Sequence, residues 1–334
     1  DGIAGVRVSR VKTRVAGPNP TGIPEIDEGS DRTVILPNAS LRLRLNDTLQ
    51  LRAAVSKTRT LPSFGDLNPA LSLGPPTTNP GGIGTPSNPR GGSGGNPFLR
   101  PFTSWNYDVA AEFYLRRTAF ASITGFHREI DGFIQQRTFD VNDPTLGTLR
   151  ITGPVNTGKG RITGVELQGQ AFADFEWLPD WARGFGAQAN LTYIDAKVQQ
   201  PSGPGAAPLT FQPITDQLNG VSKWNYNLVG IYERYGLAAR LTYNGRSTFR
   251  ATQQFRGDDI YREFAHPADR LDLSLNYDIA EQLTIFGDWT NITRKTFRQD
   301  FTSARNGAPE AEFIRYRRYD ESTLSLGVRF RFGG

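Results

Sequence analysis

Residues 324–332 read Leu-Ser-Leu-Gly-Val-Arg-Phe-Arg-Phe, so every second side chain is apolar and the others are small or basic. A period of two is that of a β-strand, whose successive side chains point to opposite faces of a sheet. The same split recurs in residues 41–45, 49–55, 107–113, 237–243 and 271–279, and helical spacing is not sustained. The pattern therefore predicts an all-β protein built from amphipathic strands.

About twelve such strands are expected, many of them long. The strand that starts near Thr118 can face either way, because Phe120 and Phe126 compete with Ala121 and Ile123 for its apolar side. The strands are expected near residues 5–15, 33–45, 48–57, 104–115, 118–135, 161–175, 184–198, 222–234, 237–248, 269–279, 282–293 and 319–332.

The connections alternate between short and long. Tight turns are expected at residues 46–47, 116–117, 235–236 and 280–281, with a slightly longer link at 177–183 that contains Pro179. Long segments follow at about 16–32, 58–103, 136–160, 199–221, 249–268 and 294–318. An antiparallel barrel of the outer membrane has this asymmetry, with apolar side chains toward lipid and polar ones toward its interior. Soluble sandwiches have no reason to gather every long loop at one end.

Aromatic residues cluster near both ends of the expected strands, as in the two girdles of a membrane barrel. The alternative is that they are ordinary strand formers in a soluble core. The girdle candidates are Trp105, Tyr193, Trp224, Tyr243 and Phe249 near the long loops, and Trp177, Trp181, Tyr232, Tyr277, Phe330 and Phe332 near the short turns.

Composition excludes several classes of protein. The 334 residues include no Cys and no Met, and the net charge is only +5, with charges scattered rather than gathered in a stripe. Nucleic acid is therefore a poor partner, and neither a disulfide scaffold nor a transmembrane helix fits. Fourteen of the 24 residues from Gly74 to Pro97 are Gly or Pro. Because strands flank this run on both sides, we expect a mobile extracellular loop rather than a linker.

No catalytic or cofactor motif is recognisable, so the sequence does not predict an enzyme. The two histidines, His127 and His266, are expected to be ordinary polar residues near loop ends, with metal binding as the minor alternative. The glycine runs at 91–95 and 158–160 lack the spacing of a phosphate loop. The glycosylation triplet at Asn291 is expected to be accidental.

Polar residues on the interior face are the candidates for binding a solute or a plug. Glu112 and Glu166 share that face, and the alternative is that all of these groups only hydrate the wall or pair with each other. The substrate-binding candidates are Trp105, Asp108, Asn190, Arg240, Asn244 and Asp288. Basic loop residues offer attraction for an anionic ligand or lipopolysaccharide: Arg250, Arg256, Arg262, Arg294, Lys295, Arg298, Arg305, Arg315, Arg317 and Arg318.

With the strands in place, several segments resemble the TonB-dependent outer-membrane receptors. They are Leu36-Pro37-Asn38 before the strand at 41–56, Asn96-Pro97-Phe98-Leu99-Arg100-Pro101 before Trp105-Asn106-Tyr107-Asp108, Gly164-Val165-Glu166, Asn291-Ile292-Thr293, and the closing strand Gly327 to Phe332. They occur in order along nearly the whole chain.

The resemblance implies a 22-stranded barrel with an N-terminal plug and a TonB box. Because only about twelve strands and neither plug nor box are recognisable, residues 1–334 are expected to be the C-terminal portion of such a barrel. It implies import of a scarce solute, an oligosaccharide or other nutrient slightly ahead of a ferric siderophore, with energy relayed by TonB. The implied partners are the TonB complex, outer-membrane lipid and lipopolysaccharide, the barrel-assembly machinery and the small ligand.

Two other interpretations remain open. One is a complete twelve-stranded passive pore or barrel-type enzyme of the outer membrane. The other is a soluble β-sandwich that binds carbohydrate or another surface. The sandwich requires the apolar faces of the strands to be hidden between two packed layers.

Overall fold

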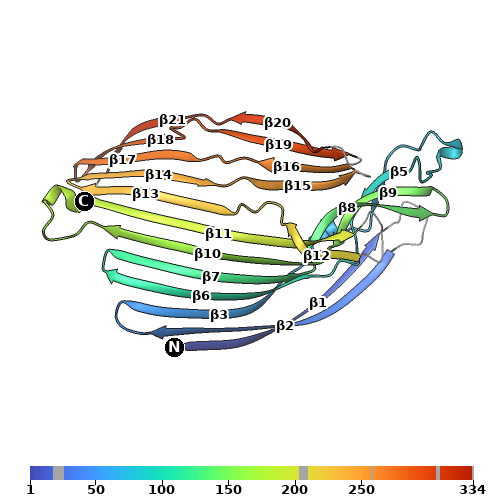
Figure 1. Cartoon of the computed structure of the whole chain (residues 1–334), viewed down its shortest axis with the longest axis horizontal. Helices are drawn as coiled ribbons and strands as arrows, with labels where there is room; N and C mark the ends of the chain where they lie inside the picture. The colour runs from blue at the N-terminus through green and yellow to red at the C-terminus, as the bar shows by residue number, and fades with distance from the viewer. Residues whose placement is uncertain (18–25, 203–209, 257–258, 306–308, 333–334) are drawn as a thin grey trace.

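The computed structural model describes residues 1–17, 26–202, 210–256, 259–305 and 309–332. Twelve long strands form the main antiparallel sheet, in which each long strand pairs with the next long strand along the chain (Figure 1). All twelve expected strands are therefore confirmed. In sheet order they are β1 (Gly2–Gly17), β2 (Ile26–Arg44), β3 (Leu49–Thr60), β6 (Phe102–Arg116), β7 (Ala119–Asp131), β10 (Lys159–Phe172), β11 (Phe185–Ser202), β13 (Trp224–Arg234), β14 (Leu237–Arg246), β17 (Arg270–Ala280), β18 (Leu283–Thr290) and β21 (Thr323–Phe330).

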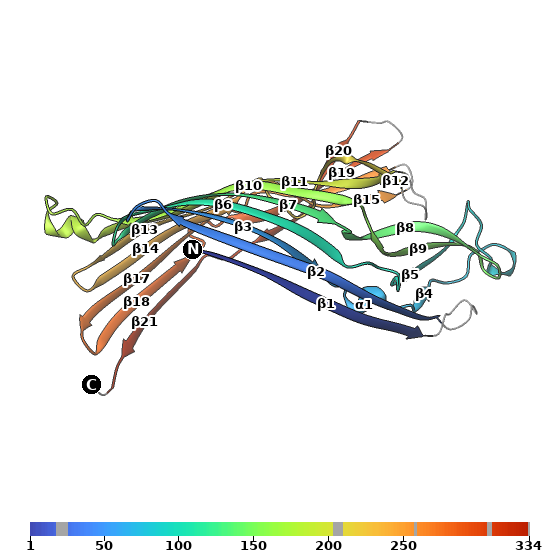
Figure 2. The same cartoon turned by 90° about the horizontal axis from the view of Figure 1, so that it is seen from below.

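The long connections build further strands at one end of the main sheet, while the short turns lie at the other end (Figures 1 and 2). One four-stranded sheet has the order β15 (Phe249–Arg256), β16 (Asp259–Ala265), β19 (Thr296–Arg305) and β20 (Ala311–Tyr319). A second has the order β4 (Leu71–Leu73), β5 (Arg90–Gly94), β9 (Gly147–Asn156) and β8 (Ile134–Asp143). β12 (Thr210–Gln217) pairs with β11.

Helical structure is limited to three short segments in the described ranges. They are α1 (Phe64–Leu67), η1 (Pro80–Gly82) and η2 (Asp180–Gly184), and the last lies in the longest of the short-turn links. Across the described part of the chain, no helix combines the length and the apolar character needed to cross a bilayer.

Strand register gives the main sheet one apolar face and one polar face. Along one cross-strand row Leu43 pairs with Leu51, and the row continues through Ala111, Ile123, Leu167 and Leu191. Directly paired residues lie on the same side of a sheet, so these side chains define the apolar face. The row also settles the facing of β7, because Ile123 belongs to the apolar face and Phe120 and Phe126 to the polar face.

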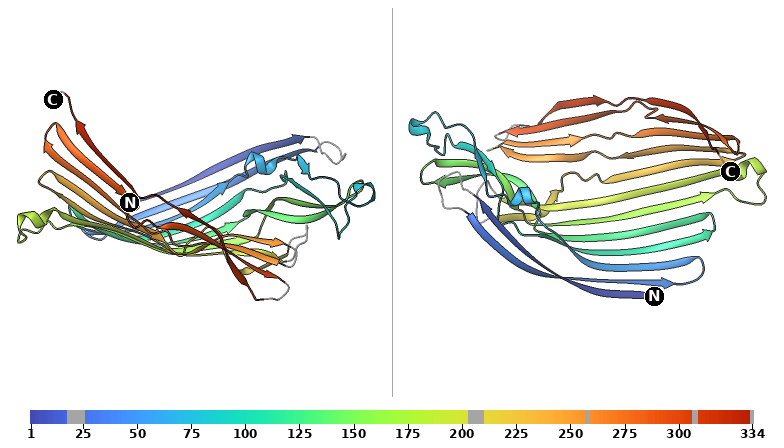
Figure 3. Two further views of the ribbon diagram at one scale, coloured as in Figure 1. Left: turned by 90° about the horizontal axis from the view of Figure 1, so that it is seen from above. Right: turned by 180° about the vertical axis from the view of Figure 1, so that it is seen from behind.

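No second layer covers the apolar face within the described residues. Its side chains remain open, with Leu41 58%, Val109 63% and Leu326 75% exposed. The sheet curves as a single layer (Figure 3). The soluble-sandwich interpretation is therefore wrong, since a sandwich buries this face against another sheet.

Aromatic rings border the apolar face at both ends. Near the long loops the ring centroids of Tyr193 and Trp224 are 4.8 Å apart, and near the short turns those of Phe185 and Tyr232 are also 4.8 Å apart. From Tyr193 to Phe185 the strand covers roughly 27 Å, or about 20 Å of height at a 40° tilt. This height is close to that of the apolar band of a membrane barrel, about 25 Å.

Part of the Gly/Pro-rich connection between β3 and β6 forms a strand, which the sequence did not predict. Its glycine run forms β5, which pairs antiparallel with β4 and parallel with β9. A Cβ on Gly92 would lie 2.8 Å from Ile151 Cδ1, and one on Gly153 would lie 2.7 Å from the Gly94 carbonyl oxygen. Glycine is thus used here because the backbones pack too closely for side chains.

Glycine also allows aromatic rings to lie flat on the polar face. A Cβ on Gly164 of β10 would lie 2.3 Å from the Tyr193 carbonyl oxygen and 2.4 Å from Cζ of Phe126. The Phe126 ring occupies that space from β7, where it is cross-strand partner of Gly164. Such aromatic-on-glycine pairs stabilise the register of strongly curved sheets.

Candidate functional site: the polar face and its rim

A continuous row of polar side chains crosses the polar face of nine strands. Each member is the direct cross-strand partner of the next, from β2 to β17. Five of its nine members are neutral amides, and its three charged members lie near the ends, two at one end and one at the other. Its members are Arg44, Gln50, Glu112, Ser122, Gln168, Asn190, Asn227, Asn244 and Arg270.

Two of the expected binding residues, Asn190 and Asn244, belong to this row. Asn227 lies between them and pairs with both. Asn190 is held in place because its Nδ2 donates to Glu166 Oε1 at 2.6 Å, and Thr192 Oγ1 donates to its Oδ1 at 3.3 Å. The three asparagines together offer a short ladder of donors and acceptors for hydroxyl groups.

Arg240 and Asp288 lie in a second row, with Ser274 between them. Arg240 Nη2 forms an ion pair with Glu233 Oε1 at 3.1 Å, so its charge is already partly balanced. Along β14, Arg240 lies four residues closer to the short turn than Asn244 does. It extends the polar wall without adding to the amide ladder.

Asp108 lies apart from the other candidates. β6, which carries it, is five strands away from β14, which corresponds to about 24 Å. Arg128 Nη2 approaches Asp108 Oδ1 at 2.6 Å and forms an ion pair with it. The expected residues therefore line one wall but do not converge on one point.

Trp105 does not share the polar face, which corrects its place among the interior residues. The residue alternates with Asp108 and shares the apolar face with Tyr107, its ring 6.4 Å away. Trp105 also pairs with Lys57, whose Nζ lies 5.5 Å from the ring centroid. Its position is that of the girdle, for which it was also a candidate.

The sequence alone missed several members of the wall. Gln50 is 8% exposed and lies between Glu112 and Tyr114, donating to Glu112 Oε2 and to the Tyr114 hydroxyl. Arg52 Nε approaches Glu112 Oε1 at 2.8 Å. The alternation of apolar and polar residues already places these side chains on the polar face. Their contacts depend on the register between β3 and β6, which the alternation does not determine.

A buried arginine, Arg250, connects neighbouring segments at the rim, the end of the main sheet where the long connections lie. The Arg250 side chain is 4% exposed, and its guanidinium forms a bidentate pair with Asp216 at 2.9 and 2.8 Å. Its Nε also donates to Asn219 Oδ1 at 2.6 Å. Bidentate, charge-assisted bonds of this kind fix geometry. Arg250 therefore joins β15 to β12 and to the segment that follows β12, and it is not free to bind a ligand.

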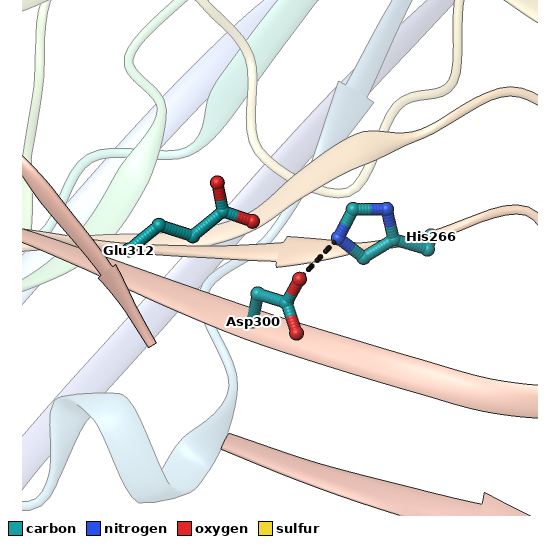
Figure 4. Close-up of side chains that lie close together, drawn as sticks. All are labelled: His266, Asp300 and Glu312. Atoms are coloured by element: carbon teal, nitrogen blue, oxygen red, sulfur yellow. Dashed lines mark ion pairs between the residues drawn. The ribbon is translucent and has the colours of Figure 1, made fainter. Parts of the chain in front are cut away.

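His266, Asp300 and Glu312 meet at the same rim (Figure 4). Their nearest ligand-type atoms lie within 4.8 Å of one another, and His266 Nε2 is 2.8 Å from Asp300 Oδ2. Arg298 donates from Nε to Asp300 Oδ1 at 2.9 Å and lies 3.9 Å from Glu312. This guanidinium holds the pKa of the Asp300 carboxyl below its usual range.

That arrangement is an ion-pair network and does not fit a metal centre. Arg298 Nη2 lies within ion-pairing distance of both carboxylates, Asp300 and Glu312. The arginine also supplies the positive charge that the carboxylates require. We therefore assign no metal to these side chains.

Most of the basic loop candidates with described side chains have acidic partners. Arg294, Lys295 and Arg317 are instead exposed, and the side chains of Arg256 and Arg305 lie outside the described residues. The pairs are Arg250 with Asp216, Arg262 with Glu310, Arg298 with Asp300, Arg315 with Glu263, and Arg318 with Asp320.

Comparisons with solved structures show the same fold at low sequence identity. The siderophore receptor PirA of Acinetobacter baumannii is 15% identical, with a TM-score of 0.56 over 93% of this chain and 46% of that one. A ferric enterobactin receptor PfeA of Pseudomonas aeruginosa, bound to enterobactin, is 16% identical, with a TM-score of 0.57 over 91% and 42%. A Serratia marcescens hemophore receptor HasR, in complex with HasA and heme, is 16% identical, with a TM-score of 0.58 over 99% and 47%.

The chain thus spans less than half the length of these solved receptors. No curated protein matches the sequence. The model of the TonB-dependent receptor-like β-barrel family matches residues 1–292. This match agrees with the apolar face, the two girdles and the asymmetric loops of an outer-membrane barrel. The chain therefore belongs to the TonB-dependent receptor family and carries sequence of its outer-membrane β-barrel.

Proposed function

We propose that residues 1–334 form the C-terminal portion of a 22-stranded receptor barrel that imports a scarce solute with energy relayed by TonB. The family match carries this proposal, supported by the coverage of less than half of each solved receptor. In the described structure β1 and β21 end the sheet, each pairing on one side only. The remaining strands, the plug and the TonB contact belong to the rest of the proposed receptor. The barrel-assembly machinery is its partner during insertion.

For the solute, we propose an oligosaccharide or another neutral polar nutrient. The amide ladder of Asn190, Asn227 and Asn244 supports this choice, because amides supply donors and acceptors that match hydroxyl groups. Arg240, which lies on β14 with Asn244, is already paired with Glu233 at 3.1 Å. We propose that the ladder lines the path of the solute or holds the plug.

A ferric siderophore is the second candidate. The exposed bases Arg294, Lys295 and Arg317 near the long loops support it, since none of them forms an ion pair with a residue in the described ranges. Two solved structures of similar fold are described as receptors for siderophores, one of them in complex with enterobactin. The two candidates differ in how strongly salt weakens binding, because only a charged ligand is screened.

The test is uptake by cells that carry or lack the receptor. We expect deletion to abolish growth on a limiting oligosaccharide, and Asn190→Leu with Asn244→Leu to reduce its uptake about tenfold, with little effect of salt. Trp105→Phe on the apolar face is the matched control and should leave uptake unchanged. Loss of ferric-siderophore uptake with a steep salt dependence would favour the second candidate. Unchanged uptake of every solute after deletion would refute import.

A further inference from the structure

We infer that the Phe126 ring is a stacking platform for one pyranose ring of the imported oligosaccharide, and that Glu166 accepts a hydrogen bond from a hydroxyl group of the same sugar. The inference rests on the proposed function, because it assigns a contact to the sugar proposed above. Phe126 lies on β7 and Glu166 on β10. Both side chains belong to the polar face and are partly exposed.

The Phe126 ring lies flat against the wall of strands. Its Cζ would be 2.4 Å from a Cβ on Gly164, its cross-strand partner on β10. The backbone therefore covers one face of the ring, and the other face is turned toward the interior. Ile194 pairs with Gly164 on the next strand and continues this apolar surface. A sugar ring presents C–H groups on its face and hydroxyl groups at its edge, so such a surface suits its face.

A fixed ion pair borders the ring on its other side. Asp108 is the cross-strand partner of Phe126 on β6, and Arg128 Nη2 donates to Asp108 Oδ1 at 2.6 Å. Arg128 Nη1 also donates to the Tyr107 carbonyl oxygen at 2.9 Å, which holds the guanidinium close to the backbone. The pair uses its charges internally and is not available to a charged ligand. Its role is to fix the edge of the platform.

Glu166 supplies the free acceptor beside the ring. Its Oε1 accepts from Asn190 Nδ2 at 2.6 Å, whereas its Oε2 accepts no hydrogen bond from a described residue. The carboxylate is therefore held in one orientation with one oxygen unused. Glu166 also has no ion-pair partner among the described residues, so its negative charge disfavours an anionic ligand and leaves a neutral sugar as the better match.

Glu166 connects the platform to the amide ladder. Phe126 and Asn190 are separated by two strand spacings and four residues, which correspond to about 16 Å. One sugar ring cannot span this distance, but a short oligosaccharide can. The platform and the ladder are thus two contact points for one sugar chain.

The platform lies where a solute arrives from outside. Gly164, under the Phe126 ring, precedes Val165, which pairs with Tyr193 of the girdle near the long loops. Phe126 therefore lies on the interior wall at the height of that girdle. With the long loops outside, as proposed, this height is the outer mouth of the barrel.

The test measures binding of neutral trisaccharides, built from glucose, mannose, galactose or xylose, to the whole receptor in detergent by isothermal titration calorimetry. We expect at least one of them to bind, and Phe126→Leu to weaken its binding about tenfold through loss of the ring face. Phe126→Tyr keeps the ring and should retain affinity within about threefold. Glu166→Gln keeps the shape of the acceptor but removes its charge, and it should weaken binding about fivefold.

Phe172→Leu is the matched control. Phe172 also lies on a glycine, Gly186, but at the end of β10 near the short turns. Its variant should bind the sugar as the parent does, and heat-modified mobility on gels confirms that each variant is folded.

The outcomes separate this inference from the proposed function. Parent-like affinity of Phe126→Leu for a sugar that the parent binds would overturn the platform and leave sugar import standing. An equal loss in Phe172→Leu would overturn the platform too, because it would indicate a general effect of aromatic packing. Failure of the parent to bind any trisaccharide would overturn both the platform and the proposed solute. Binding of ferric enterobactin in place of sugar, weakened in Phe126→Leu, would assign the ring to a siderophore and overturn the inference.

Discussion

Replacing Asn291 should destabilise the turn that links β18 to the outer strands by about 3–4 kcal/mol. Asn291 is 0% exposed and has a φ of 50°, in the left-handed region. Its Nδ2 donates to the carbonyl oxygens of Asp320 at 3.0 Å and Glu321 at 3.4 Å, and its Oδ1 accepts from Lys295 N at 3.1 Å. Asn291→Ala removes these bonds at about 1 kcal/mol each, and the left-handed backbone adds about 1 kcal/mol.

Two further substitutions separate these contributions. Asn291→Gly keeps the backbone conformation without strain, so it should cost about 1 kcal/mol less than Asn291→Ala. Asn291→Asp should be at least as damaging as alanine, because it replaces the Nδ2 donor by a buried carboxylate oxygen that would face the carbonyl oxygens of Asp320 and Glu321. The burial of Asn291 also makes its glycosylation triplet inaccessible.

The free energy of unfolding is measured by urea titration in lipid vesicles with tryptophan fluorescence. Trp289 reports on the turn directly, since its Nε1 donates to Ser322 Oγ at 2.9 Å. A parent-like stability of Asn291→Ala would refute the role of the side-chain bonds. A glycine variant less stable than the alanine variant would refute the role of the left-handed backbone.

Three other substitutions test the packing and the ion pairs. Gly164→Val should cost about 2–3 kcal/mol of unfolding free energy through overpacking, whereas Gly125→Val, with no atom within 4 Å of its Cβ, should be neutral in the same titration. Arg250→Ala should cost about 3 kcal/mol by removing the bidentate bonds to Asp216 and the bond to Asn219 and should expose the rim to protease, unlike the exposed Arg317→Ala. Arg234, at the end of β13, lowers the pKa of Asp180 to about 2. The Asp180 carboxylate therefore stabilises the fold above about pH 4, and this stabilisation is lost as the pH falls through about 2. Asp180→Asn should remove this part of the acid dependence; an unchanged acid profile would contradict the pairing.

The twelve long strands were predictable because burial on one side only imposes a period of two on each of them. The strands of the two loop sheets were not predicted, and β5 shows why. β5 contains glycine where strand formers are expected, and it exists because Leu73 and Ile151 pack against its backbone. Such a strand has no side-chain pattern of its own. Its sequence therefore resembles a linker until its neighbours are known.

The sequence predicts which face of the sheet each candidate residue occupies, but it does not predict which of these residues lie side by side on neighbouring strands. Alternation places Asn190 and Asn244 on the polar face, yet only the pairing of both with Asn227 shows that they are neighbours. Short turns fix register within a hairpin, whereas β11 and β13 are joined by a long segment that does not. Trp105 is the reverse case. Trp105 is two residues from Tyr107, so the alternation of β6 already placed both on the apolar face. Only its aromatic character suggested a binding role.

The balance of charge separates the parts of the molecule that recognise ligands from those that hold it together. Buried or half-buried ion pairs such as Arg250 with Asp216 and Arg128 with Asp108 use their charges internally. A group already satisfied in this way gains little from a ligand, because binding would have to replace one partner by another. Selectivity must then come from groups whose capacity is unused. On the polar face we propose that these are the amides of Asn227 and Asn244, whose side chains form no hydrogen bond with a described residue and would select a solute by the geometry of its hydroxyl groups.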